Sequence, residues 1–342
     1  MRSNLPITEQ LKFNKAIERI ALRYSNQGLA SYIRSCKCSE PLPNTCYALP
    51  KDHKEAPLKG RPIIAAQNSC STKLANMISN NLKLILPKVK AHLTSTQHFL
   101  NDLTEFGDLS GLRMASLDVS NLYGSIPLIS MNNSLGLIEA VTDFFDINRE
   151  GTKLVDLCRE DFQNLLELLL NSDTYMLNNK IYKQTKGIAM GNSAAAMLAI
   201  IFMDYLDNSI MKKCSSIRFY RRYIDDIFLL YDENIDPQRI LHCSNTVHQD
   251  IKFTMELAQS GNIAFLDVEL HNNLGKIDYE LYIKPCHSGT ILPYSSRVPF
   301  SQKRNLAFTE ILRAFRNSSN KHLRDIQARR TTTRVGRRHG RR

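Results

Sequence analysis

Apolar residues recur at helical spacing in five stretches of the chain, and each stretch predicts a helix. The stretches are residues 8–34, 72–86, 151–171, 194–210 and 301–316. Pro41 and Pro43 follow the first stretch and end it, and Asn192–Ser193 can cap the fourth. The last stretch is amphipathic, and its apolar face carries Phe308, Ile311, Leu312 and Phe315.

Shorter apolar runs that end at turn residues predict the strands. They lie at 114–119, 251–256, 265–270 and 279–283, on both sides of a basic loop within 47–66, and in hairpins at 174–182 and 218–231. A turn is predicted at 272–275. Because strands, helices and further strands follow one another along the chain, we expect an α+β fold built in layers.

The composition indicates how large a hydrophobic core the chain can form and what kind of partner it binds. The chain has 342 residues, 43% of them apolar, which suits two domains or one large multi-lobed domain. The net charge of +12 favours a polyanion, because each phosphate neutralised by Lys or Arg releases counterions. Charge alone does not distinguish nucleic acid from an acidic membrane. Residues 329–342 hold seven arginines and no acid, and this tail is expected to be disordered.

Targeting signals and cysteine spacing predict the compartment. The N-terminus lacks a signal-peptide pattern, and the longest apolar run, 194–203, is too short to span a bilayer. We expect an intracellular protein of the nucleus or cytoplasm that contacts no membrane. The eight cysteines are scattered, which predicts reduced thiols. Cys36, Cys38 and Cys46 are the weaker alternative, a zinc site, because a fourth ligand at ordinary spacing is missing.

Two adjacent carboxylates, Asp225 and Asp226, lie at the centre of the predicted hairpin RRYIDDIFLLY. Neighbouring acids repel each other unless a cation neutralises them, and Mg²⁺ prefers hard oxygen ligands. Asp118 ends the predicted strand at 114–119 and offers a third carboxylate from a separate segment, as two-metal nucleotidyl transfer requires. Taken singly, each acid is more often a solvated turn residue or a helix cap.

Two further stretches suit a nucleotide-binding site. Gly187 and Gly191 precede a predicted helix and let the backbone approach a base pair closely, although a plain junction of loop and helix has the same pattern. The basic, proline-punctuated loop suits a triphosphate, and a solvated surface loop is its alternative. The cations of this loop are Lys51, Lys54, Lys59 and Arg61.

Taken in order, these elements resemble the motifs of reverse transcriptases, most closely those of Penelope-like retroelements. The resemblance covers about residues 47–316 and rests on LPKDHK with RPI, LDVSNLYGSIP, RYIDD, IKFTMEL with FLDVEL, and LYIKP. It implies a right-hand polymerase fold with fingers, a palm containing an antiparallel sheet, and a partial thumb. The implied parts are a helical lead-in (1–46), fingers (47–113), palm (114–280, with an insertion at 131–186), primer grip and short thumb (281–328) and a basic tail (329–342).

The resemblance also implies roles for individual residues. The catalytic, metal-binding acids would be Asp118, Asp225 and Asp226, with two Mg²⁺ ions for which Mn²⁺ could substitute. The dNTP-binding residues would be Lys54, Arg61, Tyr123, Met190 and Gly191, and the Tyr123 ring would be the steric gate against a ribose 2′-OH. Tyr282, Ile283 and Lys284 would form the primer grip. Lys252 is a candidate proton donor to the leaving pyrophosphate.

The implied function is that of a nucleotidyltransferase, an RNA-directed DNA polymerase that binds an RNA template, a DNA primer and dNTPs. Its alternatives are a catalytically inactive nucleic-acid-binding remnant of a retroelement polymerase and an RNA-dependent RNA polymerase. The chain departs from the family where Asn192–Ser193 and three alanines replace the usual Ser-Pro-x-Ser-Pro. We see no GIY-YIG endonuclease motif, and therefore expect a fragment, a domesticated remnant or a member without that domain.

Overall fold

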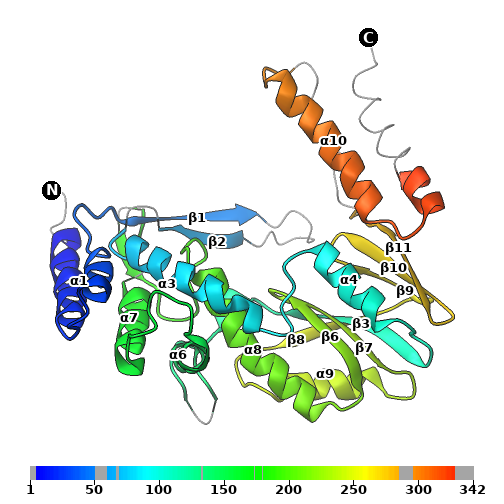
Figure 1. Ribbon diagram of the computed structural model, residues 1–342, viewed down its shortest axis with the longest axis horizontal. Helices are drawn as coiled ribbons and strands as arrows, with labels where there is room; N and C mark the ends of the chain where they lie inside the picture. The colour runs from blue at the N-terminus through cyan, green and yellow to red at the C-terminus, as the bar shows by residue number, and fades with distance from the viewer. Residues whose placement is uncertain are drawn as a thin grey trace. The chain divides into compact units, whose positions relative to one another are not determined.

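The computed structural model describes residues 5–50, 60–66, 69–131, 134–172, 174–178, 180–284 and 296–327. The chain folds into two compact units (Figure 1). Unit 1 comprises Met1–His92, Val119–Lys212 and Cys243–Lys252, and unit 2 comprises Leu93–Asp118, Lys213–His242 and Phe253–Arg342. Each unit is therefore assembled from three separate segments of the chain.

Unit 1 contains a four-stranded sheet with the strand order β2-β1-β4-β5. Its strands are β1 (Asn44–Pro50), β2 (Gly60–Ala65), β4 (Thr174–Leu177) and β5 (Lys180–Lys183). β1 pairs antiparallel with β2 and parallel with β4. The two outer pairs are thus the predicted basic hairpin and the predicted hairpin at 174–182.

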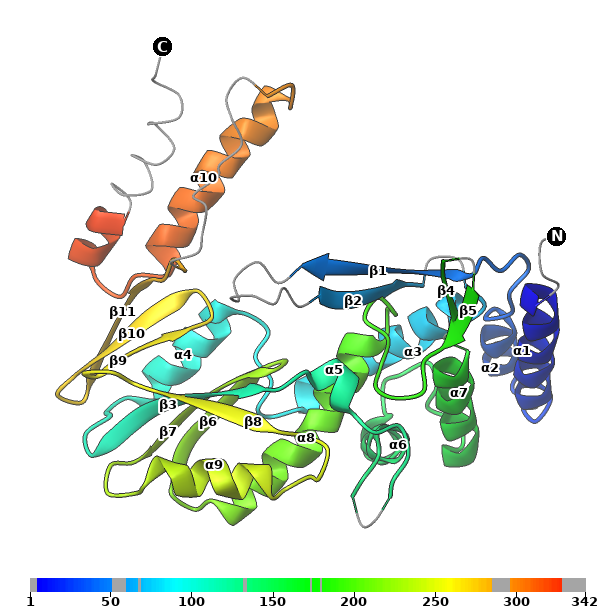
Figure 2. The ribbon, with the colours of Figure 1, turned by 180° about the vertical axis from the view of Figure 1, so that it is seen from behind.

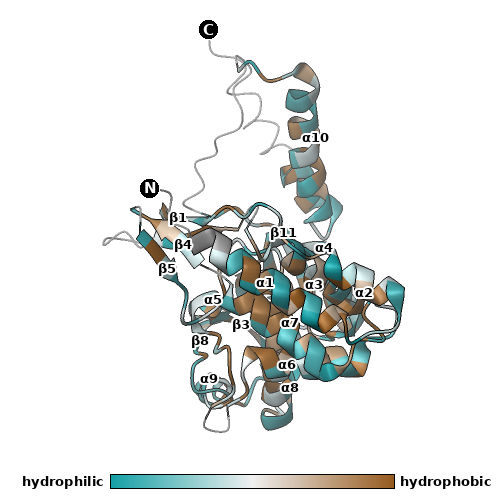
Figure 3. Cartoon of the chain, turned by 90° about the vertical axis from the view of Figure 1, so that its left-hand side faces the viewer, coloured by the Kyte–Doolittle hydropathy of each residue, from teal (hydrophilic) through white to brown (hydrophobic). Residues whose placement is uncertain are grey.

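The rest of unit 1 is mainly helical. Its helices are α1 (Leu5–Ala21), α2 (Gln27–Arg34), α3 (Thr72–Ile85) with the 3₁₀ turn η1 (Leu86–Lys88), α5 (Leu122–Ser125), α6 (Leu137–Asn148), α7 (Arg159–Asn171) and α8 (Ala195–Lys213). α1 and α7 show hydrophobic and hydrophilic residues on different sides (Figure 3), as expected for helices that cover a core. α8 is buried along most of its length, which is typical of a central helix.

Unit 2 contains two sheets and a shared core. One sheet has the order β6-β7-β3-β8, from β3 (Leu112–Val119), β6 (Ile217–Tyr223), β7 (Asp226–Asp232) and β8 (Phe253–Leu257). The other has the order β11-β10-β9, from β9 (Asn262–Phe265), β10 (Val268–Asn273) and β11 (Lys276–Leu281). Figure 2 shows both sheets from behind.

Helix α4 (Thr96–Phe106) packs on this core through Phe99, which is fully buried. The Phe99 ring makes edge contacts with Phe228 of β7, at 5.0 Å between centroids, and with Phe265 of β9, at 4.8 Å. Such edge-to-face pairs contribute about 0.5–1.5 kcal/mol each beyond area burial. The same helix therefore holds both sheets of unit 2. The unit also contains α10 (Phe300–Arg316), a helical stretch at 321–327 and most of α9 (Pro237–Asn245).

Most predicted elements are confirmed, but three boundaries differ. The stretch 8–34 is two helices, because Asn26 caps a new one by accepting hydrogen bonds from the amides of Gly28 and Leu29. The helix predicted at 151–171 begins only at Arg159. The strand predicted at 265–270 is divided between β9 and β10 by a turn in which Leu266 has a φ of 53°.

Other expectations concern surface and redox state. The seven cysteines in the described part of the chain are free, as predicted. On α10 the predicted apolar face is present, but Phe308 is 64% exposed and Phe315 is 42% exposed. Within the described residues, none of the helices combines the length and apolar character that crossing a membrane would require. The predicted arginine tail, residues 329–342, lies outside the described residues.

Candidate active site

Two of the predicted catalytic carboxylates lie directly opposite each other in unit 2. β3 and β7 pair antiparallel, and their register matches Asp118 with Asp226 and Leu117 with Ile227. Leu117 and Ile227 are buried, whereas both aspartates are exposed. Because successive side chains of a strand point to opposite faces, burial of the apolar pair fixes the two carboxylates on the other face. Directly opposed Cα atoms lie about 4.5–5.5 Å apart, so the two acids are close neighbours.

A two-residue turn between β6 and β7 presents the third carboxylate. Tyr223 pairs with Asp226, which leaves Ile224 and Asp225 in the turn. Ile224 has a φ of 57°, a left-handed conformation that costs an L-residue about 1–2 kcal/mol and that hairpin turns usually assign to Gly or Asn. Backbone strain of this kind concentrates at functional sites, where the surrounding structure maintains it.

Arg222 maintains this turn, and the sequence reasoning missed it. Its side chain is fully buried, and its Nη1 donates a hydrogen bond to the Ile224 carbonyl at 3.0 Å. The Arg222 carbonyl accepts a hydrogen bond from the Leu93 amide at 2.7 Å. A buried guanidinium persists only when its donors are satisfied, so Arg222 is a positioning residue for the acidic turn. Three arginines occur in β6, and only the strand pairing shows which one is buried.

The charge around these acids is reflected in the pKa of Asp226, which is raised from 3.8 to about 6. The largest cause is the loss of hydration where protein atoms crowd the carboxylate, followed by repulsion from Asp225 and then from Asp118. The Lys284 ammonium acts in the opposite direction and lowers this pKa. The loss of hydration and the two neighbouring carboxylates therefore disfavour the charged form of Asp226.

The three acids offer the type of ligand atom that Mg²⁺ prefers. All their ligand atoms are carboxylate oxygens, two of the acids are directly opposed, and their mutual repulsion raises the Asp226 pKa. A divalent cation would remove that repulsion, and Mg²⁺ is usually held by one or two carboxylates together with substrate phosphates. Asp118, Asp225 and Asp226 are thus the residues that could hold the metal.

The predicted primer-grip residues follow β11 in unit 2. Tyr282 and Ile283 are half-buried, and Lys284 is exposed. The Tyr282 amide donates to the Asp267 carbonyl at 2.9 Å, which fixes the chain as it leaves the sheet. Through the electrostatic effect of Lys284 on Asp226, the structure brings this segment to the acidic site.

Tyr123, the predicted steric gate, lies in unit 1. It is half-buried in the single turn α5, and its carbonyl accepts a hydrogen bond from the Ile188 amide at 2.7 Å. A Cβ atom on Gly187 would lie 2.8 Å from the Cα of Gly124. The glycine therefore permits the close packing that joins the Tyr123 turn to the segment before α8.

Met190 and Gly191 pack directly against strand β2. The Ile64 amide donates to the Met190 carbonyl at 2.7 Å, and a Cβ on Gly191 would lie 2.9 Å from the Ile64 carbonyl carbon and closer still to its oxygen. Arg61 lies on the same strand, is exposed and pairs with Leu49 of β1. Unit 1 thus gathers three of the predicted dNTP-binding residues at β2, with Arg61 on the strand and Met190 and Gly191 packed against it. Lys54, the other cation of that prediction, lies outside the described residues.

Lys252, the candidate proton donor, is exposed at the end of unit 1. Its Nζ donates to the Asn245 carbonyl at 3.4 Å, and its own carbonyl accepts from the Ser120 amide at 2.8 Å. The backbone contact ties the Lys252 segment to the short stretch between Asp118 and Tyr123. The side chain itself is engaged with Asn245, so the proton-donor role stays a prediction.

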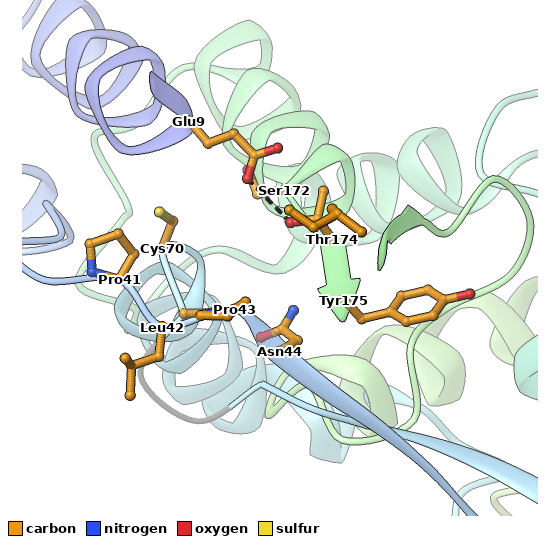
Figure 4. Close-up of a pocket in the computed structure, with 11 residues that line it drawn as sticks. Glu9, Pro41, Leu42, Pro43, Asn44, Cys70, Ser172, Thr174 and Tyr175 are labelled. Carbon is orange, nitrogen blue, oxygen red and sulfur yellow. Dashed lines mark hydrogen bonds between the residues drawn. The ribbon is translucent and has the colours of Figure 1, made fainter. Parts of the chain in front are cut away.

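A small cavity in unit 1 contains none of the predicted site residues (Figure 4). Glu9, Asn44, Cys70 and Thr174 are among its lining residues, and the Thr174 hydroxyl donates to Glu9 Oε2 at 3.2 Å. Asn44 is 1% exposed, and neither polar atom of its side chain has a hydrogen-bond partner in the described part of the chain. A volume of about 30 Å³ suits a few water molecules and not a nucleotide.

Solved polymerases share the fold described above. The telomerase of Candida albicans, in complex with the TWJ fragment of telomeric RNA, has a TM-score of 0.58 and 14% identity, covering 88% of this chain and 57% of the telomerase chain. The apo telomerase of Candida tropicalis has a TM-score of 0.54 and 12% identity, with coverages of 85% and 56%. The RNA-dependent RNA polymerase of BmCPV at the elongation state has a TM-score of 0.52 and 10% identity, with coverages of 96% and 32%.

These comparisons establish the fold class. No family model and no curated protein matches the sequence. The chain spans little more than half the length of the telomerases and about a third of the viral polymerase. At this level of identity the similarity shows the fold alone. The predicted α+β right-hand polymerase fold is confirmed.

Proposed function

We propose that this protein is an RNA-directed DNA polymerase, a reverse transcriptase related to Penelope-like retroelements. The observation that carries the proposal is the register that sets Asp118 opposite Asp226, with Asp225 in the adjoining turn. A fold of this kind can host several functions, whereas three carboxylates from two segments suit nucleotidyl transfer in particular. The net charge of +12 suits nucleic-acid substrates.

In the proposed reaction the primer 3′-OH attacks the α-phosphate of a dNTP and pyrophosphate leaves. Asp118, Asp225 and Asp226 would hold two Mg²⁺ ions, which lower the pKa of the 3′-OH and neutralise charge that develops on the phosphates. The protein supplies position: Arg222 fixes the acidic turn, and residues 282–284 would orient the primer terminus for in-line attack.

The fingers residues would bind and select the nucleotide. Arg61 would contact the triphosphate, for which a guanidinium offers paired donors. Met190 and Gly191, held against β2 by the Ile64 amide, would support the nascent base pair. The Tyr123 ring would exclude a 2′-OH. RNA template, DNA primer and dNTPs are thus the partners that we propose.

The test is extension of oligo(dT) on poly(rA) with dTTP and Mg²⁺. Wild-type protein should extend the primer, and Asp225→Asn should abolish extension while template–primer binding stays nearly intact. Glu233→Gln is the matched control, because this exposed acid follows the opposite end of β7. At 3.3 Å per residue it lies about 23 Å from Asp226 along the strand. Extension by Asp225→Asn at the wild-type rate contradicts the proposal, as does binding without extension by the wild type.

The sugar specificity has its own test. If Tyr123 is the gate, Tyr123→Ala should incorporate UTP at least about tenfold better relative to dTTP, since relief of a steric clash of about 1.4 kcal/mol gives that factor. Equal use of UTP and dTTP by the wild-type protein would indicate RNA synthesis instead, and an unchanged preference in the variant would remove Tyr123 from the gate position.

A further inference from the structure

Three metal-ligating side chains converge on the β9-β10-β11 sheet of unit 2, and the proposed polymerase chemistry uses none of them. They are Glu269 and His271 of β10 and Glu280 of β11, and their ligand atoms all lie within 4.8 Å of one another. His271 Nε2 is 3.8 Å from Glu280 Oε1. All three residues are half-buried.

The register of the sheet produces this cluster. Glu269 lies directly opposite Glu280 in the antiparallel pair of β10 and β11, and like charges in directly opposed positions destabilise a sheet. His271 is two residues beyond Glu269 and therefore lies on the same face. The opposite face carries the buried residues Val268 and Leu270, so the core fixes the register and holds the two carboxylates together.

Side chains outside the cluster orient two of its members. His271 Nδ1 lies 3.0 Å from the Oδ1 of Asn262, its register partner on β9. Since an amide oxygen only accepts hydrogen bonds, this contact places the proton on Nδ1 and leaves the Nε2 lone pair directed at the carboxylates. Such a partner on the second nitrogen is the usual companion of a metal-binding histidine.

The two carboxylates are also placed so that they could bind a cation. Gln327 Nε2 donates to Glu280 Oε2 at 2.5 Å, and the other oxygen, Oε1, is the one that lies 3.8 Å from His271 Nε2. Glu269 has no hydrogen-bond or ion-pair partner among the side chains of the described residues. One neutral imidazole and two carboxylates together carry the charge of −2 that a divalent cation would balance.

We propose that Glu269, His271 and Glu280 form a binding site for a divalent transition metal, with Zn²⁺ as the preferred ion. Zn²⁺ accepts a mixed set of nitrogen and oxygen ligands, whereas Mg²⁺ strongly favours oxygen ligands alone. The site is distinct from the all-carboxylate set of Asp118, Asp225 and Asp226, and the inference does not depend on the proposed polymerase activity. The ion would join β10 to β11 and, through Gln327, hold the helical stretch 321–327 on this sheet.

The experiment is a titration of the metal-free protein with Zn²⁺ alone, in competition with a zinc-indicator dye. We expect one Zn²⁺ per chain at this site, at least tenfold weaker binding in Glu269→Gln and in His271→Asn, and unchanged binding in Asp118→Asn. His322→Asn is the matched control, because this histidine is exposed within the same helical stretch 321–327. Co²⁺ in place of Zn²⁺ should give visible absorption bands that His271→Asn loses and Asp118→Asn keeps.

A melting experiment separates metal binding from folding. Zn²⁺ should raise the melting temperature of the wild type and leave that of Glu269→Gln unchanged, while the metal-free variant should melt no lower than the metal-free wild type because one of two opposed charges is gone. Absence of Zn²⁺ binding by the wild type, full binding by both variants, or loss of this Zn²⁺ in Asp118→Asn would overturn the proposal.

Discussion

Substitution of Gly191 tests whether the segment before α8 packs directly against strand β2. Its φ is 119°, and a Cβ would meet the Ile64 carbonyl well inside van der Waals contact. Gly191→Ala therefore has two costs. The conformation itself costs a non-glycine residue about 1–3 kcal/mol. Moving the backbone to relieve the collision breaks the 2.7 Å hydrogen bond from the Ile64 amide to Met190, and an unsatisfied buried donor costs about 1–3 kcal/mol.

The expected destabilisation by Gly191→Ala is therefore about 2–6 kcal/mol. Gly151→Ala is the matched control, because Gly151 also belongs to unit 1, has a φ of 81°, and has nothing within 4 Å of an added Cβ. This variant carries only the same conformational cost of about 1–3 kcal/mol. The difference between the two variants isolates the contact with β2.

Urea denaturation followed by circular dichroism measures the unfolding of unit 1 in both variants. The shift of the urea midpoint of each variant from the wild-type midpoint gives its loss of stability. At a temperature where both remain folded, Gly191→Ala should also raise the KM for dTTP more than Gly151→Ala does. Equal midpoint shifts would show that the glycine is needed for its φ alone and that the segment does not lie flush on β2.

Three further predictions concern stability and the acidic turn. The pKa of Asp226 is about 6 in the folded protein and 3.8 as a free side chain, so its charge disfavours folding above pH 6 and this penalty fades as the pH falls toward 3.8. In thermal melting with EDTA present, Asp226→Asn should be more stable than the wild type at pH 8 but not at pH 4. Equal stability of the two proteins at pH 8 would contradict the raised pKa of Asp226. Arg222→Met should lower kcat for primer extension at least about tenfold, the effect of 1.4 kcal/mol, with template–primer Kd unchanged; an unchanged kcat would remove its role in holding Ile224. Asn44→Leu should raise stability by about 1–3 kcal/mol in urea denaturation, because its amide is buried without a partner in the described residues; a loss of stability would show that the amide is satisfied.

The fold was predictable where the local pattern and the tertiary structure agree. Apolar runs located β3, β6 and β7, and the resemblance named the acids that these strands carry. The turn at Leu266 was not predictable, because no Gly or Pro marks it and only packing imposes its positive φ. Helix α4 was not predicted, although its sequence carries the signals: Ser95 caps it by accepting from the His98 amide, and Phe99, Leu100, Leu103 and Phe106 recur at helical spacing.

For the candidate site, the identity of the residues could be inferred from the sequence but their neighbours could not. In the sequence, Arg222 does not differ from the other two arginines of β6, and only the folded structure shows that its side chain is buried. The opposition of Glu269 and Glu280 depends on the register of two strands, which spacing alone does not reveal. Both features arise from contacts between segments that are separate in the chain.

Because Asp118 and Asp226 are paired across two strands, the acidic site depends on whether an insertion adds an odd or an even number of residues. One residue inserted in β7 directly after Asp226 would turn that carboxylate to the opposite face of the strand, away from Asp118, because side chains alternate between faces. Two inserted residues would restore the face but shift the carboxylate by about 6.6 Å along the strand, away from Asp118. We therefore expect changes of length at the Tyr223–Asp226 end of this hairpin to disrupt the pairing of the two acids. Libraries that change loop length should instead begin beyond Asp232, at the opposite end of β7.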